Sequence, residues 1–154
     1  MTFGSVRWPF AVKLLLLMLA IPSAPAILAQ SVRESHVQAH VPDAKTFRSL
    51  LVRDAGAFLS NRIGRQATAE YEFLREGATQ TGIAFPKFYL WVRAVDKDKR
   101  VLIEGAMRVA AIERTHFEVT DFLTRQEILA APARMEAIFP RLLLSSIQQR
   151  AEGK

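Results

Sequence analysis

The stretch of sequence that decides the fold is FYLWVRAV, residues 88–95, together with VLIEGAMRV, residues 101–109. The first segment is rich in aromatic and β-branched residues and carries apolar side chains on both faces, which is typical of a buried strand. The second resumes the apolar pattern after the polar run DKDK at 96–99, which indicates a hairpin. Gly105 lies inside the second strand and predicts a bulge or a bend, where a side chain would obstruct close approach. A long antiparallel hairpin is therefore expected.

One further strand is expected on each side of this hairpin. Before it, Tyr71 and Phe73 alternate with charged residues, which predicts a partly exposed strand. After it, Phe117 and Val119 alternate with polar residues, which predicts a fourth strand with one buried face. Four consecutive strands joined by short polar turns favour an antiparallel meander.

Helical patterns precede and follow the predicted sheet. Apolar residues recur at helical spacing over 47–59, behind Asp43, whose carboxylate can cap the first turn. After the sheet, the T-x-x-E pattern of Thr124 and Glu127 predicts a capping box. A second amphipathic pattern runs over 135–147 and is interrupted by Pro140, which predicts a kink or a break. The expected fold class is α+β, with an N-terminal helix packed on a four-stranded antiparallel meander and closed by a kinked C-terminal helix.

The beginning of the chain has the pattern of a secretory signal peptide over residues 1–29. Its two charged residues are basic and precede an apolar run at 14–21, and small residues follow before cleavage after Ala26 or Ala29. The alternative is an uncleaved membrane anchor, but spanning a bilayer needs roughly 20 apolar residues without interruption. We therefore expect a periplasmic or secreted protein, associated with a membrane only if the leader is retained.

The rest of the chain has the length and composition of one globular domain. Of 154 residues, 50% are hydrophobic and 23% are charged, which excludes global disorder. We expect a polar tether at 30–42, a single domain at 43–150 and a short tail at 151–154. The chain contains no cysteine, which excludes disulfides, a CxxC redox site and a thiol nucleophile.

The positive charge of the chain does not predict a nucleic-acid partner. The 21 Lys and Arg against 15 Asp and Glu give a net charge of +6, and removing the leader's two basic residues leaves +4. Acidic residues are interleaved with the basic ones, whereas a duplex-binding surface concentrates its cations on one element.

The layout of a leading helix on a curved antiparallel meander resembles the cystatin-like or NTF2-like α+β superfold of small secreted bacterial domains. The resemblance is carried by the helix at 43–59, the hairpin at 88–95 and 101–109 with its Gly105 bend, and the strand at 116–123. It implies either a binding module or an enzyme, because this superfold hosts both. Some NTF2-like enzymes pair a His with a carboxylate inside the sheet, and here the nearest match is His116, Glu118 and Asp121.

The alternation of apolar and polar residues in the strand at 116–123 indicates that His116 and Glu118 lie on the solvent side and not in a catalytic pocket. Phe117 and Val119 are expected to face the core together with Asp121, which sends His116 and Glu118 toward solvent. Asp121 is then explained by capping the following turn.

Two other groups of residues are candidates for binding. Tyr89 and Trp91 share a face and, with Arg93, would form a binding patch if no helix covered that face; burial in the core is the commoner arrangement. His36 and His40 are spaced i, i+4 and could be two metal ligands, but without a third ligand they are interpreted as part of a solvated tail.

The sequence therefore predicts an exported, non-catalytic domain that binds an envelope protein or a small apolar ligand. It predicts no cofactor and no metal. The alternative is a periplasmic NTF2-like enzyme that uses the His116 acid–base pair.

Overall fold

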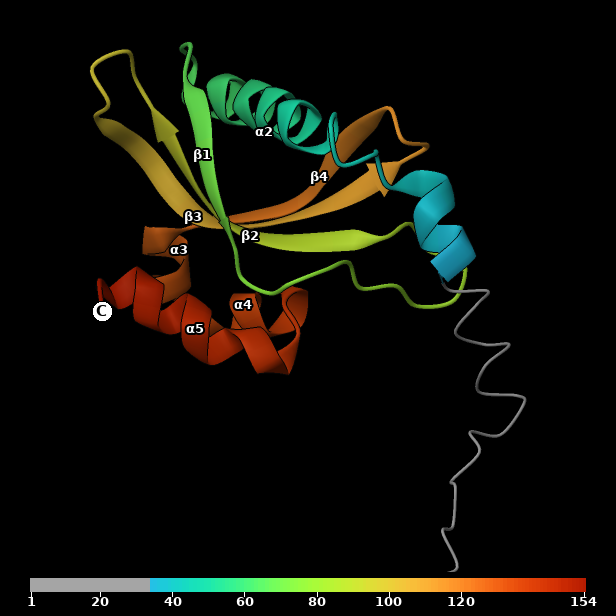
Figure 1. Ribbon diagram of the computed structural model, residues 1–154. Helices are drawn as coiled ribbons and strands as arrows, with labels where there is room; N and C mark the ends of the chain where they lie inside the picture. The colour runs from blue at the N-terminus through green and yellow to red at the C-terminus, as the bar shows by residue number, and fades with distance from the viewer. Residues whose placement is uncertain (1–33) are drawn as a thin grey trace, which may run out of the picture.

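A computed structural model describes residues 34–154 of the chain, so the predicted signal peptide and its cleavage sites lie outside the described residues. Four strands form one antiparallel sheet in the order β1-β2-β3-β4 (Figure 1). They are β1 (Thr68–Phe73), β2 (Lys87–Val95), β3 (Val101–Ile112) and β4 (His116–Thr124). Each strand pairs with the next one along the chain, so the predicted meander is confirmed.

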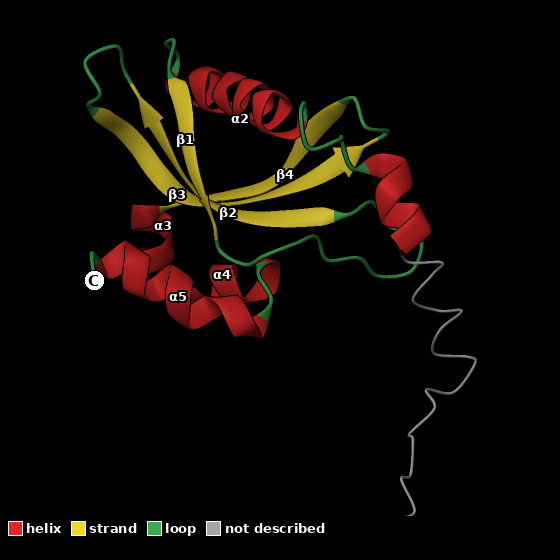
Figure 2. Ribbon diagram, viewed as in Figure 1, coloured by secondary structure: helices red, strands yellow, loops and turns green. Residues whose placement is uncertain are grey.

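Helices cover both faces of this sheet. One face carries the long helix α2 (Phe47–Ile63), and the opposite face carries three short helices at the C-terminus (Figure 2). These are α3 (Arg125–Ala130), α4 (Pro132–Ile138) and α5 (Arg141–Glu152). The predicted α+β class is thus confirmed, as is its order of helix, four strands and helical C-terminus. No helix among residues 34–154 has both the length and the apolar character needed to cross a bilayer.

The alternation of side chains along β2 builds two separate cores. Phe88, Leu90 and Val92 face α2, where they join Leu51 and Leu59 of that helix. The intervening residues face the C-terminal helices and form a second core. Its buried members are Tyr89, Trp91, Ala106, Leu123, Ile128, Met135, Phe139, Leu143, Ile147 and Ala151. Because each face of the sheet is covered by helices, the central strand is apolar on both sides.

The start of α2 differs from the prediction by about one turn. The Asp43 carboxylate accepts hydrogen bonds from the backbone amides of Lys45 and Thr46, at 2.9 and 3.0 Å, but these residues form a turn that precedes the helix. The helix itself starts at Phe47 and ends at Gly64, which adopts the left-handed conformation with φ of 70°. Asp43 therefore caps the leading turn, and the helix continues beyond the apolar pattern at 47–59 to Ile63.

The predicted signals at the C-terminus are confirmed. The Thr124 hydroxyl accepts from the Glu127 amide at 3.1 Å, and the Glu127 carboxylate accepts from the Thr124 amide at 2.8 Å, which is the capping box that begins α3. Pro140 has no amide proton to donate, and the helix breaks there into α4 and α5. The break lets both halves pack on the second core.

Residues 34–40, which we predicted to be part of a polar tether, instead form a short helix at one end of the sheet (Figure 1). The His40 carbonyl accepts a hydrogen bond from the Arg114 amide at 2.8 Å, in the turn between β3 and β4. Val41 packs against the first core. The polar sequence does not prevent this docking because only a few of its side chains face the protein.

Candidate functional site

Tyr89 and Trp91 do not form an exposed patch, because the C-terminal helices cover their face of the sheet. Their exposed fractions are 5% and 6%. The Tyr89 hydroxyl lies 3.1 Å from the Thr79 hydroxyl, so its polar end is satisfied inside the fold. Arg93, the third residue of the predicted patch, is partly exposed and lies 3.6 Å from the Glu70 carboxylate. The condition for the predicted binding patch is therefore not met, and the two aromatic residues are core residues.

His116 and Glu118 lie where the alternation of β4 predicts, on its solvent side. Both are exposed. The His116 Nδ1 lies 2.9 Å from the hydroxyl of Thr115. They are paired across the sheet with the apolar residues Ile112 and Ala110.

Asp121 differs from the prediction, because a β-bulge changes the face on which it lies. Asp121 pairs with Arg108 and Val119 pairs with Val109, so Thr120 is the extra residue of β4. The Asp121 carboxylate accepts from the Arg108 Nε at 2.7 Å. Arg108 also donates to the Ile138 carbonyl at 3.0 Å, at the end of α4. Asp121 therefore faces the C-terminal helices and holds the arginine that attaches α4 to the sheet.

The open part of the sheet is the beginning of β3. β4 pairs with β3 only from Gly105 onward, where Gly105 lies opposite Thr124. Of the preceding residues of β3, Val101, Ile103 and Glu104 pair with β2, and Leu102 is the extra residue of a β-bulge. No strand of the described residues pairs with the other side of this segment. A four-residue length of strand edge is therefore left without a neighbouring strand.

The last pair between β3 and β4 joins Gly105 and Thr124. A Cβ atom on Gly105 would lie 2.0 Å from the Leu123 carbonyl oxygen, so the two backbones approach as only glycine allows. The predicted obstruction to a side chain is present, but the strand pairing is regular on both sides of Gly105, and the bulges of β3 and β4 lie at Leu102 and Thr120 instead. Immediately afterward Thr124 caps α3, and the chain turns away from β3.

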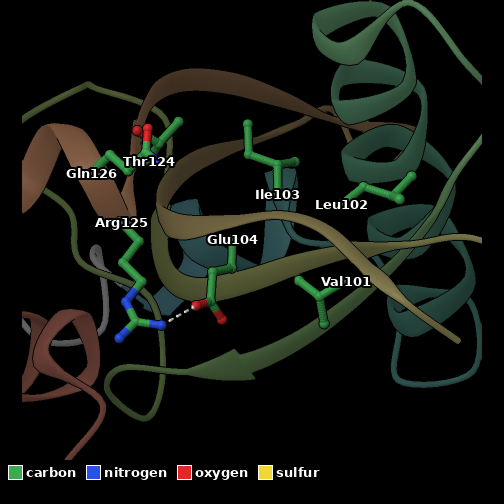
Figure 3. A pocket seen from close by; sticks show the side chains of 7 residues that line it. All are labelled: Val101, Leu102, Ile103, Glu104, Thr124, Arg125 and Gln126. Atoms are coloured by element: carbon green, nitrogen blue, oxygen red, sulfur yellow. Dashed lines mark hydrogen bonds and ion pairs between the residues drawn. The ribbon is translucent and has the colours of Figure 1, made fainter.

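A surface cavity of about 380 Å³ lies beside this edge. Figure 3 shows the seven residues that line it, which come from the beginning of β3 and from the junction of β4 with α3. They are Val101, Leu102, Ile103, Glu104, Thr124, Arg125 and Gln126. Val101, Leu102 and Ile103 make the apolar part of this wall, and Val101 is 50% exposed.

The two charged residues of the cavity are engaged with each other. Arg125 donates to the Glu104 carboxylate at 3.0 Å, as the dashed line in Figure 3 marks. The same guanidinium donates to the Ala151 carbonyl at 2.6 Å, near the end of α5. These contacts fix one end of the cavity and leave its apolar side open, which is an arrangement suited to binding an extended segment.

The other edges of the sheet carry features that discourage pairing with a further strand. β1 presents Glu70 and Glu72, and the Glu72 carboxylate is held by Arg150 at 2.5 Å. β4 has its bulge at Thr120 and exposed polar residues. Charged side chains and bulges are common protections of sheet edges. The run Val101–Ile103 carries a bulge at Leu102, and what distinguishes this edge from the others is that the run has no charged side chain.

No group of three or more His, Asp or Glu side chains within residues 34–154 is arranged to hold a metal ion. The chain matches no protein-family model, no curated protein and no solved structure.

Sequence reasoning missed the open edge of β3. Its only signal in the sequence is the uncharged run VLI directly after the polar hairpin. That run predicts a strand, but whether its second edge is covered depends on where β4 ends.

Proposed function

We propose that this protein is an exported, non-catalytic binding domain that accepts an extended segment of a partner protein at the open edge of β3. The observation that carries the proposal is the unpaired length Val101–Glu104 beside the cavity of about 380 Å³. Strand addition of this kind takes affinity from main-chain hydrogen bonds and specificity from pockets for alternate side chains.

The dimensions of the edge indicate the kind of segment that fits. Four residues of strand span about 13 Å, which matches four or five residues of an extended peptide. The Val101–Ile103 side of the cavity is apolar, so it suits aliphatic or β-branched side chains. Glu104 and Arg125 neutralise each other and do not select a charged segment.

A protein partner is favoured over a small apolar ligand because the faces of the sheet are filled by side chains. The residues that could have lined a pocket in the sheet are buried against α2 on one face and against α3–α5 on the other. The exposed positions of His116 and Glu118 and the engagement of Asp121 by Arg108 give no support to an enzyme. The proposal includes the resemblance to the cystatin-like or NTF2-like superfold, which is supported by a helix packed on a curved antiparallel meander.

Export is supported by the basic, apolar and small-residue pattern of residues 1–29. The mass of the protein recovered from an expressing bacterium tests it. Removal of the leader after Ala26 or Ala29 is expected, and a chain that retains Met1 would contradict cleavage.

The strand-addition site is tested with a displayed library of random eight-residue peptides, followed by affinity measurements on the selected sequences. Val101→Lys places a charge on the open edge and is expected to weaken binding at least about tenfold, because a desolvated charge opposes strand pairing. Ile83→Lys is the matched control, since Ile83 is 96% exposed in the loop between β1 and β2.

Hydrogen exchange then locates the bound peptide. Slower exchange of amides in Val101–Glu104 is expected on binding. Protection confined to other segments, or equal binding by the V101K and wild-type proteins, would refute the assignment. Urea unfolding of both variants shows that any loss of binding does not come from unfolding.

A further inference from the structure

A second cavity lies between α2 and the outer edge of β1. Its volume is about 480 Å³, and it is lined by Arg48 and Val52 of α2 and by Ala69, Glu70 and Tyr71 of β1. It shares no lining residue with the cavity beside β3. A volume of this size lies in the range of small-molecule binding sites.

The path of α2 across the sheet opens this cavity (Figure 1). At the start of the helix, Phe47 packs on Phe88 of β2 and Phe117 of β4, at ring centroid distances of 5.1 and 4.9 Å. Further along, Gly56 lies against β1, where a Cβ would be 3.7 Å from the Ala69 nitrogen. The two helix residues that line the cavity lie between these contacts, where α2 leaves the edge of β1 uncovered.

The floor of the cavity is apolar. Ala69 and Tyr71 point to the α2 side of the sheet, because side chains alternate along β1, and Val52 adds to the floor from the helix. Phe73 continues the same side of β1 and is 41% exposed. Its ring centroid lies 5.4 Å from that of Tyr71 and 6.2 Å from that of Phe47, so rings connect the strand to the helix at this end. A bound molecule can therefore bury apolar surface here.

Two polar groups of the lining have no partner within residues 34–154. The Arg48 guanidinium is exposed and takes part in no hydrogen bond or ion pair with this part of the chain, and the Tyr71 hydroxyl likewise has none. By contrast, Arg53 on the same helix is held by Asp54 at 2.7 Å. A guanidinium has five N–H donors and a phenol has one O–H donor, so both groups can donate to an anion.

The remaining lining residue, Glu70, does not neutralise Arg48. Glu70 pairs with Arg93 of β2, and alternation places both side chains on the opposite face of the sheet from Tyr71. There the Glu70 carboxylate lies 3.6 Å from the charged groups of Arg93 and Lys99. The cavity therefore keeps one uncompensated positive charge beside an apolar floor.

We propose that this cavity binds a small amphiphilic acid, whose carboxylate accepts from Arg48 and Tyr71 and whose aliphatic or aromatic body lies on the apolar floor. A single free cation matches a single negative charge, and a charge-assisted hydrogen bond is stronger than a neutral one. Contacts between α2 and β1 close the cavity at both ends, which favours a small molecule over a polypeptide. The site is independent of strand addition at β3, which uses other residues.

The wild-type chain provides the first test, with sodium octanoate as the probe and nuclear magnetic resonance of the tyrosine rings as the readout. The chain has two tyrosines, and Tyr89 serves as the internal reference because it is buried with its hydroxyl 3.1 Å from that of Thr79. The Tyr71 signals are expected to shift and to saturate at one octanoate per chain, while those of Tyr89 stay in place. Unmoved Tyr71 signals, or equal shifts of both rings, would overturn the proposal.

Two related compounds separate the contributions of the charge and of the apolar floor. Octan-1-ol has the same hydrocarbon chain without the charge, and acetate has the charge without the chain. Each is expected to bind about tenfold more weakly than octanoate, because it lacks either the charge-assisted hydrogen bonds or the buried apolar surface. Equal affinity for octanoate and either compound would contradict the proposed mode of binding.

Substitutions provide the second test, with the affinity for octanoate measured by calorimetry. Arg48→Gln removes the charge and is expected to weaken binding about tenfold, and Tyr71→Phe keeps the ring and is expected to weaken it about threefold. Arg65→Gln is the matched control, because Arg65 is exposed and does not line the cavity. An equal loss in R65Q, or unchanged affinity in either R48Q or Y71F, would overturn the assignment. Urea unfolding shows whether each variant is folded, and V101K is expected to bind octanoate as the wild type does.

Discussion

Replacing Gly105 by alanine tests the close approach that ends β4. The new Cβ would lie 2.0 Å from the Leu123 carbonyl oxygen and 2.8 Å from the Thr124 Cα. Side-chain carbons essentially never come within 3.0 Å of such atoms, so β4 must move away from β3 by about 1 Å. Both obstructing atoms belong to the backbone, so no rotation of a side chain relieves the contact.

The expected cost follows from this displacement. Overpacking of a well-packed site costs about 1–3 kcal/mol. The movement also disturbs the hydrogen bonding around the Gly105–Thr124 and Ala106–Leu123 pairs, where each bond contributes about 0.5–1.5 kcal/mol. Alanine also lowers the conformational entropy of the unfolded chain, which stabilises the folded state by about 0.4–1 kcal/mol and offsets part of this cost. We expect the free energy of unfolding to fall by about 2 kcal/mol, and Tm by about 8 °C for a domain of this size.

Urea unfolding followed by tryptophan fluorescence measures the effect, because Trp91 is buried in the second core and is the only tryptophan within residues 34–154. Gly56→Ala is the matched control. Gly56 lies inside α2, and a Cβ there would meet its nearest neighbours at an ordinary 3.7 Å. This control is expected to gain about 0.5–1 kcal/mol from helix propensity. A G105A protein as stable as the wild type would refute the reasoning.

Two further predictions concern the C-terminal helices. Ile147→Ala removes a fully buried side chain from the second core and is expected to lower the free energy of unfolding, measured in urea, by about 2–5 kcal/mol. Leu142→Ala is the control on the same helix. Because Leu142 is 90% exposed, this substitution should change the free energy of unfolding by less than about 0.5 kcal/mol. Equal effects of the two substitutions would contradict the assigned packing of α5. The hydrogen bond from the Thr124 amide is the chief reason that the pKa of Glu127 lies below its usual value. The charged carboxylate therefore stabilises the fold fully above the unfolded pKa of about 4.3. This stabilisation is lost as the pH falls through the folded pKa. Glu127→Gln should therefore cost about 0.5–1 kcal/mol at pH 7 and progressively less below about pH 4, and a difference that stays constant from pH 7 to pH 3 would contradict this account.

Much of the fold could be predicted because its signals are local. The alternation over residues 88–95 reflects a strand buried on both faces, and the pattern of Thr124 and Glu127 produced the expected capping box. Pro140 broke the last helix because proline lacks the amide proton that a helix interior requires. The Asp43 carboxylate was predicted to cap the first turn of the helix, but it accepts from the amides of a turn that leads into the helix.

The candidate sites were harder to predict because they depend on contacts between distant segments. A single extra residue, Thr120, turns Asp121 to the opposite face, and periodicity alone does not reveal a bulge. Tyr89 and Trp91 alternate in sequence as a surface patch or a core would, and their burial depends on where α3–α5 pack.

By itself, the sequence determined the four strands, the helices that precede and follow them and the two-faced character of β2, but it did not reveal the helix at residues 34–40. These properties follow from side-chain periodicity, turn residues and capping, which act over a few neighbouring residues. Only the tertiary structure decided which edge is left open and where the His40 ring lies. β3 and β4 make their last pair at Gly105, where the two backbones come too close for a side chain, and the His40 ring packs against Phe85 of a loop far along the chain. Each of these results is a contact between segments far apart in the chain, for which local sequence carries no signal.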